Sequence, residues 1–341
     1  MRCVMIEDVK KFKVSSIEEP KVQRGKVLID VLKCGICGSD IHYWVSGEPV
    51  GLVMGHEFSG AVVDNGGRED LKVGDRVTAL PISPCDECSA CLSGNHQYCS
   101  KTWADAVGLS LTNPGALSSR ISVRSDMVVK LPDTVSDIEG SLVEPTAVSL
   151  HATSLANIKV GDKVLIVGGG IIGLLCAMFA KMEGASYVAI SEVNKKRGEK
   201  AVELGVADEF FDAKDTNLIN KTNIITGGGF DIVLDCCGNS PAVSTSIMAV
   251  KPGGVVILVG VSLGTVTIPS VVAVMRELTI KGAIAYTKED FQTCIDLIAS
   301  KKIDVLKFVD DEVGLDRVQE AYERLTSGND SAVKIIVDPN K

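Results

Sequence analysis

The spacing of apolar and polar positions changes its rhythm near residue 150. Before that point the apolar runs are short, as in GKVLIDVLKCGICG (25–38) and GDRVTALPI (74–82), and Gly, Pro and Asp turns separate them. Short runs bounded by turn residues are typical of β-strands. Residues 1 to about 147 are therefore expected to form an irregular β-barrel.

After residue 150 the pattern becomes strand, turn and helix in repetition. KVLIVG (163–168) is a continuous apolar run, which is typical of a strand buried on both faces. GLLCAMFAKMEGA (173–185) follows with helical periodicity and a natural stop at Gly184. Further apolar runs occupy residues 187–191, 231–238, 254–260 and 278–284. Buried strands that alternate with helices predict an α/β fold with a doubly wound parallel sheet.

The length of the chain, 341 residues, suits two domains. VKIIVDP (333–339), close to the end, predicts one more strand that joins the first domain. We therefore predict a first domain of residues 1–147 that is completed by residues 285–341, and a second domain of residues 148–284.

The composition argues against several partners and compartments. The net charge of −9 disfavours nucleic acid and anionic membranes, because phosphate surfaces repel a negative chain. No stretch approaches the roughly twenty apolar residues of a membrane helix, and charges interrupt the first residues, MRCVMIEDVKKFKV, too often for a secretory signal. We expect a cytoplasmic protein whose eleven cysteines stay thiols or bind metal.

GGGIIG (168–173) lies between the predicted strand 163–168 and its helix, so Gly168, Gly170 and Gly173 fit the pattern G-x-G-x-x-G. Such a turn lets a pyrophosphate approach the backbone at a helix N-terminus. Glu192 follows nineteen residues after Gly173, where a carboxylate can accept hydrogen bonds from the adenosine ribose and repel a 2′-phosphate. We therefore predict NAD binding in preference to NADP, and the basic run 195–197 keeps NADP open as the alternative.

A first group of metal-ligating residue types lies in CGICGSDIHYW (34–44) and GHEFSG (55–60). A catalytic zinc takes three ligands from Cys, His and Asp or Glu and keeps one position open. Cys37, His56 and Glu57 could supply those three, although each residue alone could equally be a structural residue of the core.

A second group is the run CDECSACLSGNHQYC (85–99), with the spacing C-x2-C-x2-C-x7-C. This spacing admits an iron–sulfur cluster, a structural zinc or a catalytic zinc, and disulfides are disfavoured in a reducing compartment. In bacterial ferredoxins the fourth cysteine follows after three residues and precedes a proline, and neither holds here.

Six motifs occur in one order along the chain: C-G-I-C-G-S-D-x-H, G-H-E, the four-cysteine run, VEPTAVSLHA (143–152), GGGIIG and AIAYTKEDF (283–291). With these motifs the chain resembles the zinc-dependent medium-chain dehydrogenases, and among them the sorbitol, butanediol and threonine dehydrogenases. The resemblance implies a GroES-like catalytic domain with a zinc lobe, a Rossmann domain, two Zn²⁺ per chain and a homotetramer or homodimer.

The resemblance also implies roles for individual residues. Cys37, His56 and Glu57 would hold the catalytic zinc, and Glu144 would either ligate it or bind its water, a choice that stays open. Ser39 and His42 would relay the proton to solvent, since histidine exchanges protons near neutral pH. Cys85, Cys88, Cys91 and Cys99 would hold a structural zinc, because four thiolates leave no open position. Further cofactor contacts would be Ile172, Arg197, Val259, Gly260, Val261, Ala285 and Tyr286.

The implied activity is hydride transfer with NAD(H) that interconverts a secondary alcohol and a ketone, with a diol, polyol or amino alcohol as substrate. NPGALSSRISV (113–123) departs from the family's pattern near the substrate cleft, so the sequence does not identify the substrate. The alternatives are an NADP(H)-dependent dehydrogenase of a bulkier hydroxyl substrate, a zinc-free reductase, a non-catalytic NADH-binding protein and an iron–sulfur electron carrier.

Overall fold

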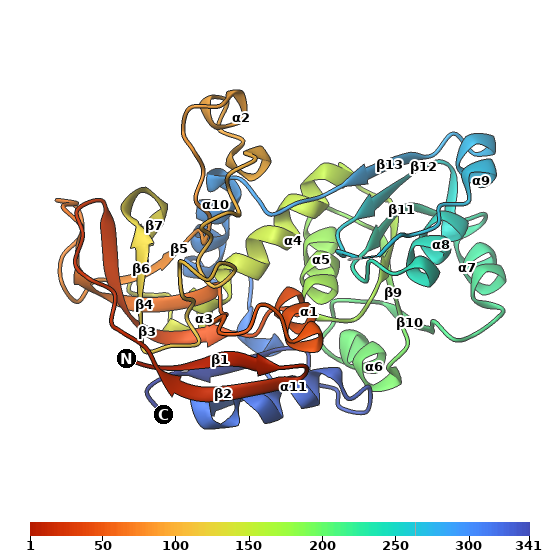
Figure 1. Cartoon of the computed structure of the whole chain (residues 1–341). Coiled ribbons are helices and arrows are strands. Elements are labelled where there is room, and N and C mark those ends of the chain that lie inside the picture. The colour runs from red at the N-terminus through yellow and green to blue at the C-terminus, as the bar shows by residue number, and fades with distance from the viewer. Residues whose placement is uncertain (263) are drawn as a thin grey trace. The chain divides into compact units, whose positions relative to one another are not determined.

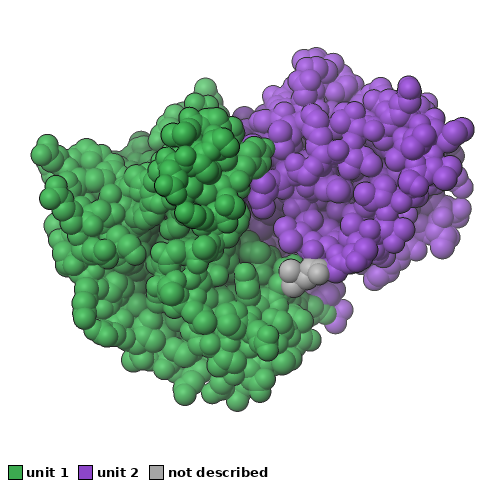
Figure 2. Space-filling view, turned by 45° about the horizontal axis from the view of Figure 1, so that its top comes forward, with its two compact units in different colours: residues 1–147, 286–327, 334–341 green, residues 148–285, 328–333 purple. Residues whose placement is uncertain are grey.

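Two large sheets organise the chain, one in each of two units (Figure 1). Unit 1 comprises residues 1–147, 286–327 and 334–341, and unit 2 comprises residues 148–285 and 328–333 (Figure 2). The computed structural model describes residues 1–262 and 264–341. The observed division differs from the predicted one at Ala285 and at residues 328–333, which cluster with unit 2. Two hydrogen bonds explain the second difference, from Asn194 Nδ2 to Asp330 O (2.9 Å) and from Lys196 Nζ to Asn329 O (3.1 Å).

Unit 1 is built on a seven-stranded sheet with the order β14-β15-β3-β4-β5-β7, and β6 pairs with β3. A separate antiparallel hairpin joins β1 and β2. The strands are β1 (Arg2–Asp8), β2 (Lys11–Ser16), β3 (Lys26–Gly35), β4 (Glu57–Asp64), β5 (Arg76–Ala79), β6 (Arg120–Arg124), β7 (Val128–Lys130), β14 (Asp311–Gly314) and β15 (Ile335–Asp338). The helices are α1 (Gly38–Ser46), α2 (Ser89–Leu92), α3 (Asp137–Ser141), α10 (Lys288–Ala299) and α11 (Val318–Thr326).

The core of unit 1 follows from alternation along β3. Val27 and Ile29 are fully buried, and they pair with Val123 and Ile121 of β6. Side chains at alternate positions of a strand share one face. This packed face fixes the path of β3 up to Gly35, which lies two residues before Cys37.

Unit 2 holds a six-stranded parallel sheet with the order β10-β9-β8-β11-β12-β13. The strands are β8 (Lys163–Val167), β9 (Tyr187–Glu192), β10 (Glu209–Asp212), β11 (Phe230–Asp235), β12 (Val250–Leu258) and β13 (Thr279–Gly282). The helices are α5 (Ile171–Met182), α6 (Lys195–Glu203), α7 (Leu218–Thr226), α8 (Ser240–Ala249) and α9 (Ser270–Met275), and α4 (Val143–Ala156) runs across the boundary at residue 147.

The predicted fold class, a doubly wound parallel sheet together with a separate irregular β domain, is confirmed. The predicted strand 333–339 corresponds to β15, which belongs to the sheet of unit 1. β10 was not among the predicted strands, because its sequence EFFD is short and flanked by charges. Among the described residues, no helix has the length and apolar character needed to cross a membrane.

Candidate active site and cofactor site

The pairing of β3 with β4 brings the first metal-ligating group together. Gly35 of β3 lies opposite Glu57 of β4, so Cys37, which caps α1 just after β3, comes close to His56 and Glu57. One ligand atom from each of these three residues lies within 4.8 Å of the others. His56 and Glu57 are buried, and Cys37 is half-buried. The structure thus places a thiol, an imidazole and a carboxylate around one point.

Glu57 also has a buried counter-charge. Lys334, at the start of the last strand segment, is fully buried, and its Nζ donates hydrogen bonds to Glu57 Oε2 and to Ile36 O (3.0 Å). Glu57 Oε1 is buried and has no hydrogen-bond partner among the described residues. Gly35 leaves room for this ion pair, because a Cβ there would lie 2.4 Å from Glu57 Oε2. Lys334 was not singled out from the sequence, because it lies within the predicted strand 333–339 and looks there like an ordinary polar position of a strand.

His56 and Cys37 have further contacts that orient them. His56 Nδ1 lies 3.3 Å from Oδ1 of the buried Asp40, which leaves Nε2 as the nitrogen available to a metal. The backbone N–H and the hydroxyl of Ser39 both donate to Cys37 Sγ, at 3.4 and 3.2 Å. Burial raises the pKa of the Cys37 thiol. A thiol, an imidazole and a carboxylate whose ligand atoms converge are the kind of donor set that zinc takes in proteins.

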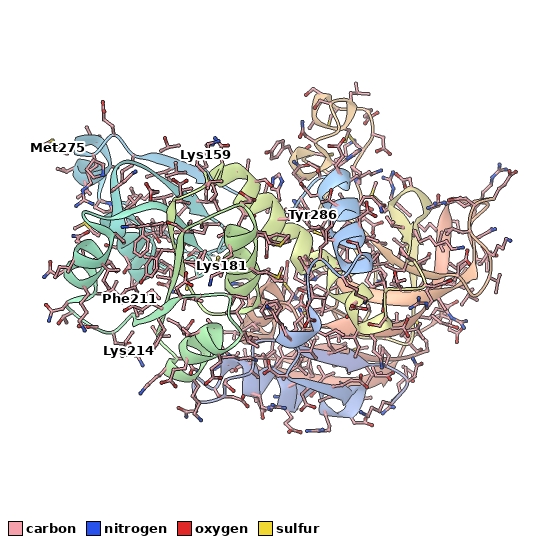
Figure 3. The ribbon with its side chains drawn as sticks, turned by 180° about the vertical axis from the view of Figure 1, so that it is seen from behind. Lys159, Lys181, Phe211, Lys214, Met275 and Tyr286 are labelled. Atoms are coloured by element: carbon pink, nitrogen blue, oxygen red, sulfur yellow. The ribbon has the colours of Figure 1, made fainter. Side chains whose placement is uncertain are left out.

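Glu144 lies in the first turn of α4 and is buried. Its Oε1 accepts a hydrogen bond of 3.0 Å from the hydroxyl of Tyr286, which is itself buried just before α10 (Figure 3). Burial raises the pKa of Glu144 to about 7. In the part of the chain that the structure describes, the group that converges within 4.8 Å contains Glu57 and does not contain Glu144.

Ser39 and His42, the predicted relay, lie three residues apart on α1, a spacing that puts them on one face of the helix. Ser39 is half-buried and His42 is exposed. The helix therefore leads from the sulfur of Cys37, which Ser39 contacts, to the solvent at His42.

The four cysteines of the run 85–99 form a second, separate group, whose ligand atoms also lie within 4.8 Å of one another. The sulfur of Cys91 lies 3.9 Å from that of Cys85 and 3.6 Å from that of Cys88. A zinc–sulfur bond of about 2.3 Å predicts about 3.8 Å between the sulfurs of a tetrahedral site, so the spacing fits zinc. Backbone N–H groups of Cys85 and Lys101 donate to Cys99 Sγ, and these bonds lower the pKa of Cys99 to about 6.

The dinucleotide turn of unit 2 requires its glycines. Gly168 has φ +110°, which favours glycine, and a Cβ at Gly173 would lie 1.9 Å from Gly168 O. A Cβ at Gly170 would meet nothing within 4 Å, so this position at the start of α5 is open to a ligand. These properties fit a pyrophosphate at the helix N-terminus.

Glu192 ends β9 beside this turn and is buried. Its Oε2 accepts from Gly169 N (2.6 Å), and its Oε1 accepts from Asn194 N (2.8 Å). The carboxylate is thus fixed at the carboxyl end of the parallel strands, where nucleotides bind in such sheets.

The other predicted cofactor residues lie in several elements. Asp235 ends β11, is fully buried, and holds the loop after β12 through its carbonyl, which accepts from Val259 N and Gly260 N, both at 2.8 Å. Asp235 was not singled out from the sequence. Ala285, at φ +48°, is the last residue before unit 1 resumes. Ile172 lies in α5 and Arg197 in α6, and Val261 follows β12 with 54% of its surface exposed.

Comparison with known proteins gives one consistent family. Residues 23–133 match the model of the alcohol dehydrogenase GroES-like domain, and residues 172–300 match that of the zinc-binding dehydrogenases. The (R,R)-butanediol dehydrogenase of Neisseria gonorrhoeae is 35% identical over 346 residues, which cover 96% of each chain. A probable D-xylulose reductase A of Aspergillus clavatus is 34% identical over 89% of this chain and 87% of its own.

Among solved structures, 2R,3R-butanediol dehydrogenase from Bacillus subtilis superimposes with a TM-score of 0.88 at 32% identity, over 99% of both chains. This agreement extends over the GroES-like and the dinucleotide-binding parts alike. The predicted resemblance is confirmed, and the chain belongs to the zinc-dependent medium-chain alcohol dehydrogenases, a family of oxidoreductases.

Proposed function

We propose that the protein interconverts a secondary alcohol and a ketone by hydride transfer with NAD(H), at a zinc held by Cys37, His56 and Glu57. The observation that carries the proposal is the convergence of these three ligand atoms within 4.8 Å. When bound, zinc acts as a Lewis acid towards the substrate oxygen, and the nicotinamide accepts the hydride. The residues of the chain bind and orient the substrate and carry its proton to solvent.

Of the two candidate carboxylates, we assign the third ligand position to Glu57. Glu57 Oε1 is buried and has no hydrogen-bond partner in the described part of the chain, whereas Glu144 Oε1 already accepts from the hydroxyl of Tyr286. Glu144 then serves as a hydrogen-bond acceptor for a hydroxyl of the substrate or for water. Its pKa of about 7, raised by burial, suits a group that exchanges protons at neutral pH.

Ser39 and His42 carry the proton outward in this scheme. Ser39 lies against Cys37 Sγ, and His42 is exposed on the same face of α1. A histidine at the solvent end can pass a proton to buffer. The four cysteines of the run 85–99 hold a second zinc, which has no open position and stabilises the loop.

A diol or polyol is the substrate class that we propose. The butanediol dehydrogenases and the xylulose reductase among the relatives support this class. The test is a panel of secondary alcohols and ketones with NAD(H) and NADP(H), run with and without a zinc chelator. We expect turnover of vicinal diols or polyols that chelation abolishes and added zinc restores. Full turnover without zinc would contradict the proposal.

The preference for NAD rests on Glu192, whose carboxylate would repel a 2′-phosphate. Glu192→Ala should reduce the ratio of kcat/KM for NAD to that for NADP. Glu199→Ala, at an exposed position of α6, is the matched control. A wild-type protein that prefers NADP would favour the alternative.

We also propose that the protein is cytoplasmic and assembles as a homodimer or homotetramer. The compartment is supported by the cysteines, all eleven of which are free. Assembly is supported by α9, where Val271, Val274 and Met275 are 73–79% exposed, beside the edge strand β13 (Figure 3). Sedimentation of Val274→Asp against the unchanged protein would test whether this face is the contact.

A further inference from the structure

The helix that carries Ser39 and His42 also has a buried face, which the proposed reaction does not use. Asp40 and Trp44 lie four residues apart on α1, so their side chains share that face. Asp40 is fully buried and Trp44 is 3% exposed. Tyr322 of α11 is also fully buried, and its ring centroid lies 5.8 Å from that of Trp44.

The polar atoms of these three side chains lack partners. Asp40 Oδ2, Trp44 Nε1 and the Tyr322 hydroxyl are buried, and the described residues offer none of them a hydrogen bond, whereas Asp40 Oδ1 faces His56 Nδ1 at 3.3 Å. The ring of Tyr322 packs against Trp44, on the buried face of α1 that also carries Asp40. Buried polar groups in native proteins are paired with protein or with ordered water.

Packing against Phe12 keeps the rings of Trp44 and Tyr322 from turning towards other hydrogen-bond partners. Phe12 packs edge-on against Tyr322 at 4.7 Å and stacks with Trp44 at 6.3 Å between centroids. The three rings hold one another in place. Two donors, the indole N–H and the phenol O–H, therefore remain beside one carboxylate that only accepts.

We infer that one buried water molecule bridges Asp40, Trp44 and Tyr322. The water accepts from the indole N–H and from the phenol O–H, and it donates to the Asp40 carboxylate, so each of the three groups gains a partner. Without a water, the indole N–H, the phenol O–H and Asp40 Oδ2 would stay buried and unpaired, which costs free energy.

The water gives Trp44 and Tyr322 a role in the metal site. Asp40 Oδ1 lies 3.3 Å from His56 Nδ1, so whatever fixes the carboxylate also fixes the imidazole that faces the metal. Trp44 and Tyr322 are positioning residues for His56. This second step rests on the proposed function, in which His56 binds zinc, whereas the water itself does not depend on it.

Tyr322→Phe tests both steps, because it removes the hydroxyl and keeps the ring. In the zinc-loaded full-length protein we expect a lower Tm and release of the zinc at Cys37, His56 and Glu57 to a chromogenic chelator on the order of tenfold faster. The hydroxyl in a dry pocket would predict the opposite, since its removal would raise the Tm. A raised Tm or an unchanged release rate would overturn the inference.

Phe12→Leu is the matched control, because Phe12 belongs to the same ring cluster and has no polar side-chain atom. It should lower the Tm through lost packing and leave zinc release unchanged. Equal acceleration of release in both variants would assign the effect to packing and contradict the role of the hydroxyl. The zinc of the four-cysteine run provides an internal reference, because neither variant touches it.

A high-resolution crystal structure of the full-length protein tests for the water directly, and this test depends neither on bound zinc nor on activity. We expect density within hydrogen-bonding distance of Trp44 Nε1, Tyr322 Oη and Asp40. A direct hydrogen bond from Tyr322 to Asp40, with no density between them, would overturn the inference. If the water is present and Cys37, His56 and Glu57 hold no zinc, the proposed function fails while the water site stands.

Discussion

The four-cysteine run and the group of Cys37, His56 and Glu57 both belong to unit 1, but they are assembled differently. The run draws all its ligands from the 85–99 segment, and backbone N–H groups of that segment and of Lys101 hold the sulfur of Cys99. The second group joins two segments across the β3–β4 ladder and lies among buried charges. The first group is therefore a local structure that a metal can complete, and the second exists only in the folded sheet.

The two groups also differ in the charges and hydrogen bonds that surround their ligand atoms. Hydrogen bonds from the backbone lower the pKa of Cys99 to about 6, which favours the thiolate form that binds metal. In the other group Lys334 faces Glu57, and Asp40 faces His56. Four thiolates fill all four coordination positions of a tetrahedral zinc, whereas three mixed ligands leave one position open. The difference predicts that loss of a ligand from the first group mainly affects stability and that loss of a ligand from the second mainly affects turnover.

The largest expected effect comes from Cys37→Ser. Loss of the thiolate should remove the metal from this group and reduce kcat/KM by about 10³-fold or more, since Lewis-acid stabilisation amounts to several kcal/mol. Steady-state assays and zinc analysis measure the outcome, with one zinc per chain expected to remain. Retention of two zinc ions with unchanged turnover would contradict the assignment.

Lys334→Met tests the buried charges of the second group. Removing one partner of a buried ion pair should lower the free energy of unfolding of the zinc-stripped protein by about 3–5 kcal/mol. Lys33→Met is the control, because Lys33 pairs with Asp338 at a partly exposed position and should cost less. Denaturant titration measures both, and adding Glu57→Gln to Lys334→Met should restore much of the loss.

Cys88→Ser is the counterpart in the four-cysteine run. The variant should lose one zinc and about 2 kcal/mol of stability, seen as a Tm several degrees lower, because the metal no longer orders the loop. The kcat of the remaining folded protein should stay within a few-fold of the original. A stable variant that keeps both zinc ions and loses turnover would reverse the proposed roles of the two groups.

Tyr286→Phe removes the hydroxyl that holds Glu144. We expect kcat/KM to fall by about tenfold, which corresponds to one charge-assisted hydrogen bond, and the zinc content to stay the same. Tyr98→Phe, at an exposed position within the four-cysteine run, should leave both unchanged. Loss of zinc from Tyr286→Phe would instead indicate that Glu144 is a ligand.

His42→Gln should have the smallest effect. Because His42 is exposed, other bases can replace it, so kcat at neutral pH should fall only a few-fold. A high concentration of imidazole buffer should restore the rate. His96→Gln, in the four-cysteine run, should behave like the unchanged protein in the same assay. An imidazole effect of equal size in both variants would rule out the relay.

Much of the fold and part of the site follow from local pattern. Continuous apolar runs predict β8, β9 and β11 because strands buried on both faces have no polar positions. GGGIIG predicts the dinucleotide turn because only glycine fits where φ is positive or a Cβ would collide, as at Gly168 and Gly173. The four-cysteine run predicts its own metal group for a similar reason, since its ligands are neighbours in the chain.

Contacts between distant segments could not be predicted in this way. Lys334 lies 277 positions from Glu57, and Tyr286 lies 142 positions from Glu144. Trp44 and Tyr322, on α1 and α11, are brought together only when both helices pack. Spacing and periodicity describe neighbours along one element, whereas burial of a charge depends on every element around it. The sequence by itself thus determined the ligand types, the glycine turn and the order of elements, and the tertiary structure decided which buried charges and hydroxyls surround them.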